Sequence, residues 1–330
     1  MQQRKYIRQG FTLIEASIVL VILALIIGSV FLGKSLKNSA AINAQIAQIQ
    51  KYQAAVNMFQ TKYNSYLPGD IPSPYAQNFG FQTRGQKRGE GDGNGLIESN
   101  CSNCTGCADP TQGGCGEMAV FWQDLSTAGL IDTSVPTGTN QPNISAPITG
   151  NCCASVPASP GLLTQWIPQA KLGNNNFIYA YTGAIDYNSG ASFTYLNANY
   201  FGLSQVSVIG WNYESTGNSG SGAQTMTVQQ AYAIDSKMDD GLPQSGNVIA
   251  CYLDYDANNE GEVWAAGFSQ LGAGSSVTGG GFGCVPTTSA TSYASSNCFD
   301  NNGVTGVQTY SLSKNAATPN CALSFQIQNQ

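Results

Sequence analysis

The segment RQGFTLIEASIVLVILALIIGSVFLG, residues 8–33, decides the fold of the N-terminal part of this chain. From Phe11 to Leu32 the one charged side chain is Glu15. A helix over this run is about 33 Å long at 1.5 Å per residue, which is enough to cross the hydrocarbon core of a bilayer. The sequence therefore predicts a membrane-spanning helix that carries a single carboxylate.

Three basic residues, Arg4, Lys5 and Arg8, precede the apolar run, and residues 1–10 contain no acid. By the positive-inside rule this basic segment stays in the cytoplasm and the C-terminal bulk of the chain lies on the other side of the membrane. The whole chain has 330 residues and a formal net charge of −6. So acidic a protein lacks the basic surface that binds nucleic acid, and we predict no nucleic-acid partner.

The position of Glu15 needs a reason, because an ionised side chain at the centre of a membrane helix costs about 2.5 kcal/mol or more. A secretory signal peptide has a shorter apolar core followed by a small-residue cleavage site, and a plain signal anchor explains the length but not the acid. Cleavage between Gly10 and Phe11 instead creates an α-amine on Phe11, about one helical turn from Glu15. In an assembly of parallel helices, the amine of a neighbouring copy can neutralise this carboxylate and set the register between subunits.

The short basic leader, the sequence GFTLIE at residues 10–15 and the long apolar helix resemble the type IV pilin and type II secretion pseudopilin superfamily. The resemblance implies that a prepilin peptidase cuts after Gly10, that Phe11 becomes N-methylated and that Glu15 is the assembly glutamate. It also implies three kinds of partner: the peptidase, identical or related pilin subunits, and an inner-membrane assembly platform. The precursor would lie in the inner membrane, and the mature protein in an extracellular filament or a periplasmic pseudopilus. Many members of the superfamily have a proline near the end of the apolar run, where this chain has Leu32 followed by Gly33. Glycine weakens a helix by about 1 kcal/mol, against about 3 for proline.

Beyond the membrane segment, apolar residues recur at helical spacing. They are Ile42, Ile46, Ile49, Val56, Phe59 and Tyr63, and polar residues that include Asn43, Gln45, Gln48, Gln50 and Lys51 fall largely between them. This pattern predicts an amphipathic helix that continues the first one, packs its apolar stripe on a globular domain and stops at LPGDIP, residues 67–72. The expected regions are a leader (1–10), a membrane or filament-core helix (11–33), its amphipathic continuation (34–66) and an extracytoplasmic globular domain (67–330).

The rest of the chain predicts a mixture of helices and short strands. Met118, Phe121, Trp122 and Leu125 have helical spacing and precede Gly129, which suits a helix end. A further helix is expected at about 227–238 with Thr227 as its N-cap. Alternation of β-branched or aromatic residues with small ones predicts antiparallel strands within 175–187, 191–196, 206–210, 247–255 and 262–268. The predicted fold class is α+β: a long N-terminal helix packed on an antiparallel sheet whose loops are tied by disulfides.

The chain has 10 cysteines and no histidine, which excludes an imidazole base and histidine-bound metals. The first four cysteines have a spacing that also suits an iron–sulfur cluster or a zinc site. Because the N-terminus sends the domain to an oxidising compartment, we predict disulfides instead. The candidates are Cys101, Cys104, Cys107, Cys115, Cys152, Cys153, Cys251, Cys284, Cys298 and Cys321, and the sequence does not fix their pairing.

Two acidic loops are candidate calcium sites, because Ca²⁺ takes six to eight oxygen ligands. The first loop offers Asp92, Asn94 and Glu98, and the second offers Asp254, Asp256, Asn258 and Glu260. The alternative is that Asp-Gly and Asn-Gly pairs simply form turns. Some pilins and pseudopilins hold a calcium ion in their C-terminal region, so the resemblance is compatible with this metal without placing it. The predicted function requires no cofactor, and calcium is the candidate ion.

No spacing of residues indicates an active site. Glu214, Asp235, Asp239 and Asp240 do not form a recognisable glycosidase pair, and acids at the C-terminal end of a helix are ordinarily solvated. We therefore predict a non-enzymatic structural subunit, a pilin of a type IV pilus-like helical filament. The alternatives are a type II secretion pseudopilin, an adhesin or binding module displayed on a pilus, and a signal-anchored metal or redox protein.

Overall fold

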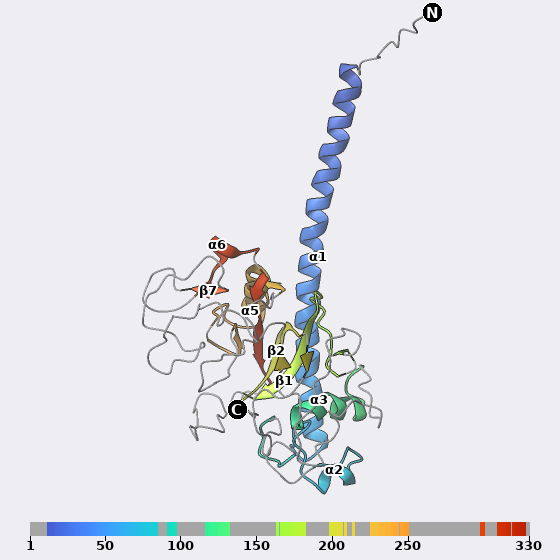
Figure 1. The fold of residues 1–330 in the computed structure, drawn as a ribbon, viewed down its shortest axis with the longest axis vertical. Helices are drawn as coiled ribbons and strands as arrows, with labels where there is room; N and C mark the ends of the chain where they lie inside the picture. The colour runs from blue at the N-terminus through green and yellow to red at the C-terminus, as the bar shows by residue number, and fades with distance from the viewer. Residues whose placement is uncertain are drawn as a thin grey trace, which may run out of the picture.

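The computed structural model describes thirteen segments of the chain: 12–84, 91–97, 116–132, 163–164, 166–182, 198–206, 208–209, 213–214, 225–243, 245–250, 298–300, 309–317 and 319–327. A long N-terminal helix, α1 (Leu13–Lys62), forms a rod, and the remaining described elements lie beside its C-terminal half. The N-terminal half of the rod projects beyond them (Figure 1). The molecule therefore has an isolated helical arm and a packed domain built around the other half of the same helix.

Helix α1 runs without a break through both predicted helical regions. Its 50 residues correspond to about 75 Å at 1.5 Å per residue. The backbone amide of Tyr63 donates to the carbonyl of Phe59 at 2.9 Å, and the helix ends just before LPGDIP, as predicted. The predicted apolar stripe from Ile42 to Tyr63 is buried or half-buried in the domain.

Two glutamines that the sequence pattern places on the polar side of α1 are in fact buried. The backbone amide of Leu172 donates to Gln45 Oε1 at 3.0 Å, and that of Lys171 donates to Gln48 Oε1 at 2.9 Å. Gln48 Nε2 also donates to the carbonyl of Gln169 at 2.9 Å. The turn at 169–172 thus has its backbone groups satisfied by side chains of α1, which is why polar residues can occupy buried positions there.

The main sheet has four antiparallel strands in the order β1 (Asn176–Thr182), β2 (Asn199–Gln205), β10 (Leu323–Gln326) and β6 (Val248–Ile249). Three two-stranded pairs accompany it: β3 (Val208–Ile209) with β4 (Tyr213–Glu214), β5 (Met226–Thr227) with β9 (Pro319–Cys321), and β7 (Phe299–Asp300) with β8 (Thr309–Tyr310). Strands β1, β3 and β6 fall inside segments predicted as strands. The predicted strands at 191–196 and 262–268 lie outside the described residues.

Strand β2 is not among the strands predicted from the sequence, because Gly202 lies at its centre and glycine weakens strand patterns. The register pairs Gly202 with Tyr179 of β1. A Cβ atom on residue 202 would lie only 1.9 Å from a ring carbon of Tyr179. The glycine therefore leaves room for a buried tyrosine ring that crosses over the strand.

Four further helices complete the described elements: α2 (Tyr75–Asn78), α3 (Gly116–Thr127), α5 (Val228–Met238) and α6 (Leu312–Asn315). Helices α3 and α5 confirm the two predicted helices. Thr227 is the N-cap of α5, and it exchanges hydrogen bonds with Gln230 in a capping box. Both α3 and α5 contact α1.

The core forms where α1, α3 and the sheet meet. Tyr52 of α1 lies edge-on to Trp122 of α3, with ring centroids 4.9 Å apart, and Trp122 stacks on Phe201 of β2 at 5.6 Å. All three side chains are buried. This packing and the antiparallel sheet confirm the α+β fold class.

One disulfide joins Cys298 to Cys321, with their Cα atoms 5.1 Å apart. Cys321 belongs to β9, and Cys298 directly precedes β7. The bridge therefore ties the β7 and β8 pair to the strand pair that leads into α5. The other eight cysteines lie outside the described residues.

Candidate functional site

The N-terminal end of α1 carries the predicted assembly glutamate within a capping box. Thr12 is the N-cap, and both its backbone amide and its hydroxyl donate to Glu15 Oε2 at 2.8 Å. The amide of Glu15 donates back to Thr12 Oγ1 at 3.3 Å. The T-x-x-E pattern at residues 12–15 is the sequence signal of such a box. The predicted processing residues, Gly10 and Phe11, lie outside the described residues.

The projecting half of α1 exposes apolar side chains on all sides. Those that remain exposed are Leu13, Ile14, Ile18, Val19, Leu20, Val21, Ile22, Leu23, Leu25, Ile26, Ile27, Val30, Phe31, Leu32 and Leu36. They cover about 36 Å of helix, and α1 is long and apolar enough in this half to cross a membrane. A helix that is apolar all round is stable only inside a membrane or among other protein surfaces.

At the other end of α1, three acidic side chains converge on the loop at 91–97. Carboxylate oxygens of Asp70, Asp92 and Glu117 all lie within 4.8 Å of one another. Asp70 accepts the backbone amides of Gly93 at 2.7 Å and Gly95 at 2.8 Å, and Glu117 Oε1 accepts that of Gly91 at 2.8 Å. Burial raises the pKa of Asp70 to about 7, against the lowering effect of the amides of Gly95 and Gly93.

The predicted calcium ligands of this loop are only partly brought together. The backbone amide of Asn94 donates to Asp92 Oδ1 at 3.0 Å, so both residues form a local turn. Asp92 also faces Asp70 and Glu117, two carboxylates that the sequence spacing did not suggest because they are distant along the chain. Glu98 lies outside the described residues, as do Asp254, Asp256, Asn258 and Glu260 of the second loop. Calcium binding stays a prediction for both loops.

A buried ion pair fixes the same region to α3. Arg84 Nη2 lies 2.7 Å and 2.5 Å from the two carboxylate oxygens of Asp124, and both side chains are almost fully buried. The backbone amide of Gly69 also donates to Asp124 at 2.7 Å. These bonds hold LPGDIP, the segment before loop 91–97 and α3 together.

A second acidic cluster lies at the C-terminal end of α5, where Asp235, Asp239 and Asp240 place carboxylate oxygens within 4.8 Å of one another. The expectation that these acids are solvated is wrong for Asp235, which is buried. It accepts the hydroxyl of Tyr310 at 2.7 Å and the backbone amide of Gly241 at 3.1 Å, and these bonds explain how a carboxyl group is tolerated there. Burial raises the pKa of Asp235 to about 7.

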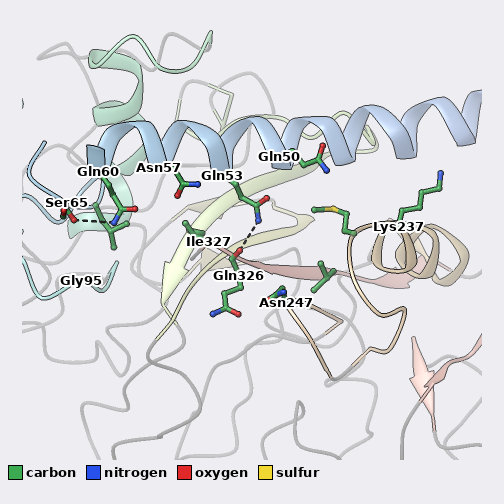
Figure 2. Close-up of a pocket in the computed structure, with 13 residues that line it drawn as sticks. Gln50, Gln53, Asn57, Gln60, Ser65, Gly95, Lys237, Asn247, Gln326 and Ile327 are labelled. Atoms are coloured by element: carbon green, nitrogen blue, oxygen red, sulfur yellow. Dashed lines mark hydrogen bonds between the residues drawn. The ribbon is translucent and has the colours of Figure 1, made fainter. Parts of the chain in front are cut away.

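A groove of about 800 Å³ runs between α1, the segment at 245–248 and the end of β10. Six carboxamide side chains line it: Gln50, Gln53, Asn57 and Gln60 of α1, with Asn247 and Gln326 opposite (Figure 2). Gln53 Nε2 donates to the carbonyl of Gln326 at 3.0 Å across it. We call this feature the amide groove. No local sequence pattern reveals it, because residues 50–60 of α1 meet residues 245–248 and 326–327, which are far from them along the chain.

Comparison with known proteins bears on the N-terminal end of the chain. No curated protein and no solved structure matches this chain. The prokaryotic N-terminal methylation motif matches residues 7–31, the leader end and most of the exposed apolar half of α1. The motif confirms the resemblance noted in the sequence: this chain carries the prepilin-type signature of type IV pilins and pseudopilins at its N-terminal end.

Proposed function

We propose that the chain is a structural subunit, a pilin, of a type IV pilus-like helical filament that assembles from the inner membrane after cleavage between Gly10 and Phe11. The observation that carries the proposal is the single helix α1, exposed and apolar in one half and packed into the domain in the other. The apolar half needs lipid in the precursor and other copies of itself outside the membrane. The packed half makes the domain move with it as one body.

In this proposal Glu15 fixes the axial register between neighbouring subunits. Thr12 holds Oε2 of Glu15, and within the described part of the chain Oε1 has no hydrogen bond. A neighbouring subunit's Phe11 amine is a suitable partner for that oxygen, because a buried carboxylate needs an opposite charge in contact. Helix packing supplies the contact area, and the charge pair selects one axial offset between subunits.

The proposal names three partners: identical or related pilin subunits, a prepilin peptidase that removes residues 1–10, and an inner-membrane assembly platform. The precursor is placed in the inner membrane and the mature chain in an extracellular filament. The motif indicates a structural, non-enzymatic protein, and the proposed role requires no cofactor.

The first experiment measures the mass and N-terminal sequence of the mature protein. We expect a chain that begins at N-methylated Phe11. An intact Met1 in surface material, or a start beyond residue 33, would contradict the proposal.

The second experiment compares Glu15→Ala with Ser17→Ala. Ser17 is the matched control because its side chain is also polar and lies in the same apolar run, where its hydroxyl only bonds the carbonyl of Ile14 at 2.8 Å. We expect Glu15→Ala to be inserted into the membrane and to be lost from sheared filaments, and Ser17→Ala to assemble normally. Normal incorporation of Glu15→Ala would rule out the register role of the acid.

The alternative assignments, a type II secretion pseudopilin and a pilus-displayed adhesin, use the same anchor. The abundance of the protein and the cell fraction in which it is found distinguish these assignments. A major pilin dominates sheared surface filaments, a pseudopilin stays in the periplasm, and an adhesin is a scarce component of the surface fraction.

A further inference from the structure

The amide groove has a chemical character that the filament role does not explain. Its four α1 residues, Gln50, Gln53, Asn57 and Gln60, follow one another at three- and four-residue steps, so they line one face of the helix over about 15 Å. Figure 2 shows these side chains on the side of α1 that faces Asn247 and Gln326. Carboxamides from separate segments of the chain therefore converge on one hollow.

Several of these carboxamides are not used by the fold. Among the described residues the side chains of Gln50, Asn57, Asn247 and Gln326 make no hydrogen bond. Each carboxamide offers two donors and an acceptor. The groove thus presents both kinds of hydrogen-bonding group to whatever occupies it.

The main-chain groups beside the groove are, by contrast, already paired. The amides of Asn247 and Val248 donate to Asp239, and the carbonyl of Asn247 accepts the amide of Gln326 at 2.8 Å. The carbonyl of Gln326 accepts Gln53, and the amide of Ile327 donates to the carbonyl of Asn199 at 2.8 Å. An added peptide strand needs free main-chain groups at a sheet edge, so the groove does not suit that mode of recognition.

The charge of the groove argues against an ionic ligand. Among the described residues that line it there is no carboxylate, and the one cation, Lys237, donates to Asn43 Oδ1 at 2.8 Å. The chain as a whole carries a net charge of −6, which disfavours anions. The groove is therefore suited to a neutral molecule.

Leu67, Val248 and Ile327 also line the groove, but each is at most 4% exposed, so the accessible lining is mainly polar. A neutral sugar matches such a lining, because its hydroxyl groups both donate and accept hydrogen bonds. The volume of about 800 Å³ lies within the range of small-ligand sites. We infer that the amide groove binds a neutral oligosaccharide, with the carboxamides on its hydroxyl groups.

This binding activity goes beyond the proposed filament role, and it is measured separately. The test uses the full-length chain in a zwitterionic detergent, because a sugar-headed detergent would compete for the groove. The probes are maltopentaose, cellopentaose and the pentamer of N-acetylglucosamine, titrated by calorimetry to millimolar concentration. Pentaalanine and a sulfated pentasaccharide are the peptide and anionic comparisons.

The test variant is Gln50→Ala with Asn57→Ala, which removes two unpaired groove amides from exposed positions where alanine favours the helix. The matched control is Gln229→Ala, at an exposed helical position outside the groove. Circular dichroism checks that both variants keep the fold.

We expect at least one neutral pentasaccharide to bind, the double variant to bind it at least about tenfold more weakly, and Gln229→Ala to bind as the parent does. The inference is overturned if no neutral probe binds, if the double variant binds as tightly as the parent, or if pentaalanine or the sulfated sugar binds in preference. Because no filament is needed, the result does not depend on whether the chain assembles.

Discussion

At the scale of single residues, two ion pairs of the same chain differ in burial. Arg84 and Asp124 are each about 1% exposed, whereas Lys51 and Asp132 are 48% and 87% exposed. A buried charge that loses its partner keeps its desolvation penalty, and an exposed one is solvated by water. Breaking the buried pair should therefore lower the stability of the fold far more than breaking the exposed pair.

We predict that Asp124→Asn lowers the free energy of unfolding by about 3–5 kcal/mol, because Arg84 is left as an uncompensated buried cation. Lys51→Met, which breaks the exposed pair, should cost less than about 1 kcal/mol. Denaturant unfolding of the chain in detergent measures both. Equal effects of the two substitutions would contradict this explanation.

Asp235 should make stability depend on pH. Its pKa rises from 3.8 to about 7, chiefly through burial, although the hydrogen bond from Tyr310 lowers it. Between about pH 4 and 7 the folded protein keeps a proton that the unfolded chain has lost. This contribution to stability is therefore complete below the unfolded pKa and is lost as the pH rises toward 7. Asp70, with its pKa raised in the same way, adds to the same trend.

We predict that Asp235→Asn, which imitates the protonated side chain, reduces the fall in unfolding temperature between pH 4 and 7. Gln229→Ala, which changes an exposed side chain that does not titrate, is the control and should leave the pH profile unchanged. Thermal unfolding at several pH values measures the effect. A profile for Asp235→Asn identical to that of the parent would show that Asp235 does not hold the proton.

At the scale of elements, the packing of β1 against β2 requires a residue without a side chain at position 202 of β2. Tyr179 is buried, and its hydroxyl lies 3.0 Å from Ser204 Oγ, so its ring has little freedom to move away from residue 202. We predict that Gly202→Ala lowers the free energy of unfolding by about 1–3 kcal/mol through overpacking. In a Tyr179→Leu background the same substitution should cost less, and a double-mutant cycle measures the difference. Additive effects would mean that the ring is not the cause.

The loop at 91–97 is the described element in which calcium binding can be tested. The sequence prediction gives a higher unfolding temperature of the full chain in calcium than in a chelator, because a bound cation would neutralise three neighbouring carboxylates. Asp92→Asn should reduce this increase. An unfolding temperature that is the same with and without calcium would leave Asp92 and Asn94 as turn formers alone.

At the scale of the whole molecule, α1 joins an apolar arm to a domain that already has its own core. The exposed large apolar residues of the described chain lie between Leu13 and Leu36, apart from Met58, Tyr75 and Tyr232. Along the described part of α1, the first buried apolar residue is Ile42. The boundary between the two halves therefore lies near residue 38.

We predict that a chain beginning at residue 37 is soluble without detergent and unfolds at the same temperature as the domain of the full chain. A chain beginning at residue 51 is the control, because it lacks Ile42, Gln45, Gln48 and Ile49 and should be strongly destabilised. Aggregation of the chain that begins at residue 37, or equal stability of the two truncated chains, would contradict this division.

The sequence predicts those helices that depend only on neighbouring residues along the chain. The apolar run, the stripe from Ile42 to Tyr63 and the caps at Thr227 and Gly129 all act within a few turns of helix, and the structure has helices there. The local pattern does not predict strand β2 or the burial of Gln45 and Gln48, because each depends on a partner more than 20 residues away, such as Tyr179 for Gly202.

By itself, the sequence determined that this chain has a membrane-length helix with one acid, an α+β domain and the prepilin-type motif, because hydrophobic periodicity and a contiguous motif need no partner to be read. The tertiary structure alone decided which acids meet around loop 91–97, that Asp235 is buried, and that carboxamides from α1, the 245–248 segment and β10 form one groove. These features arise from contacts between residues far apart in the chain, and burial and convergence of side chains exist only once those segments have packed.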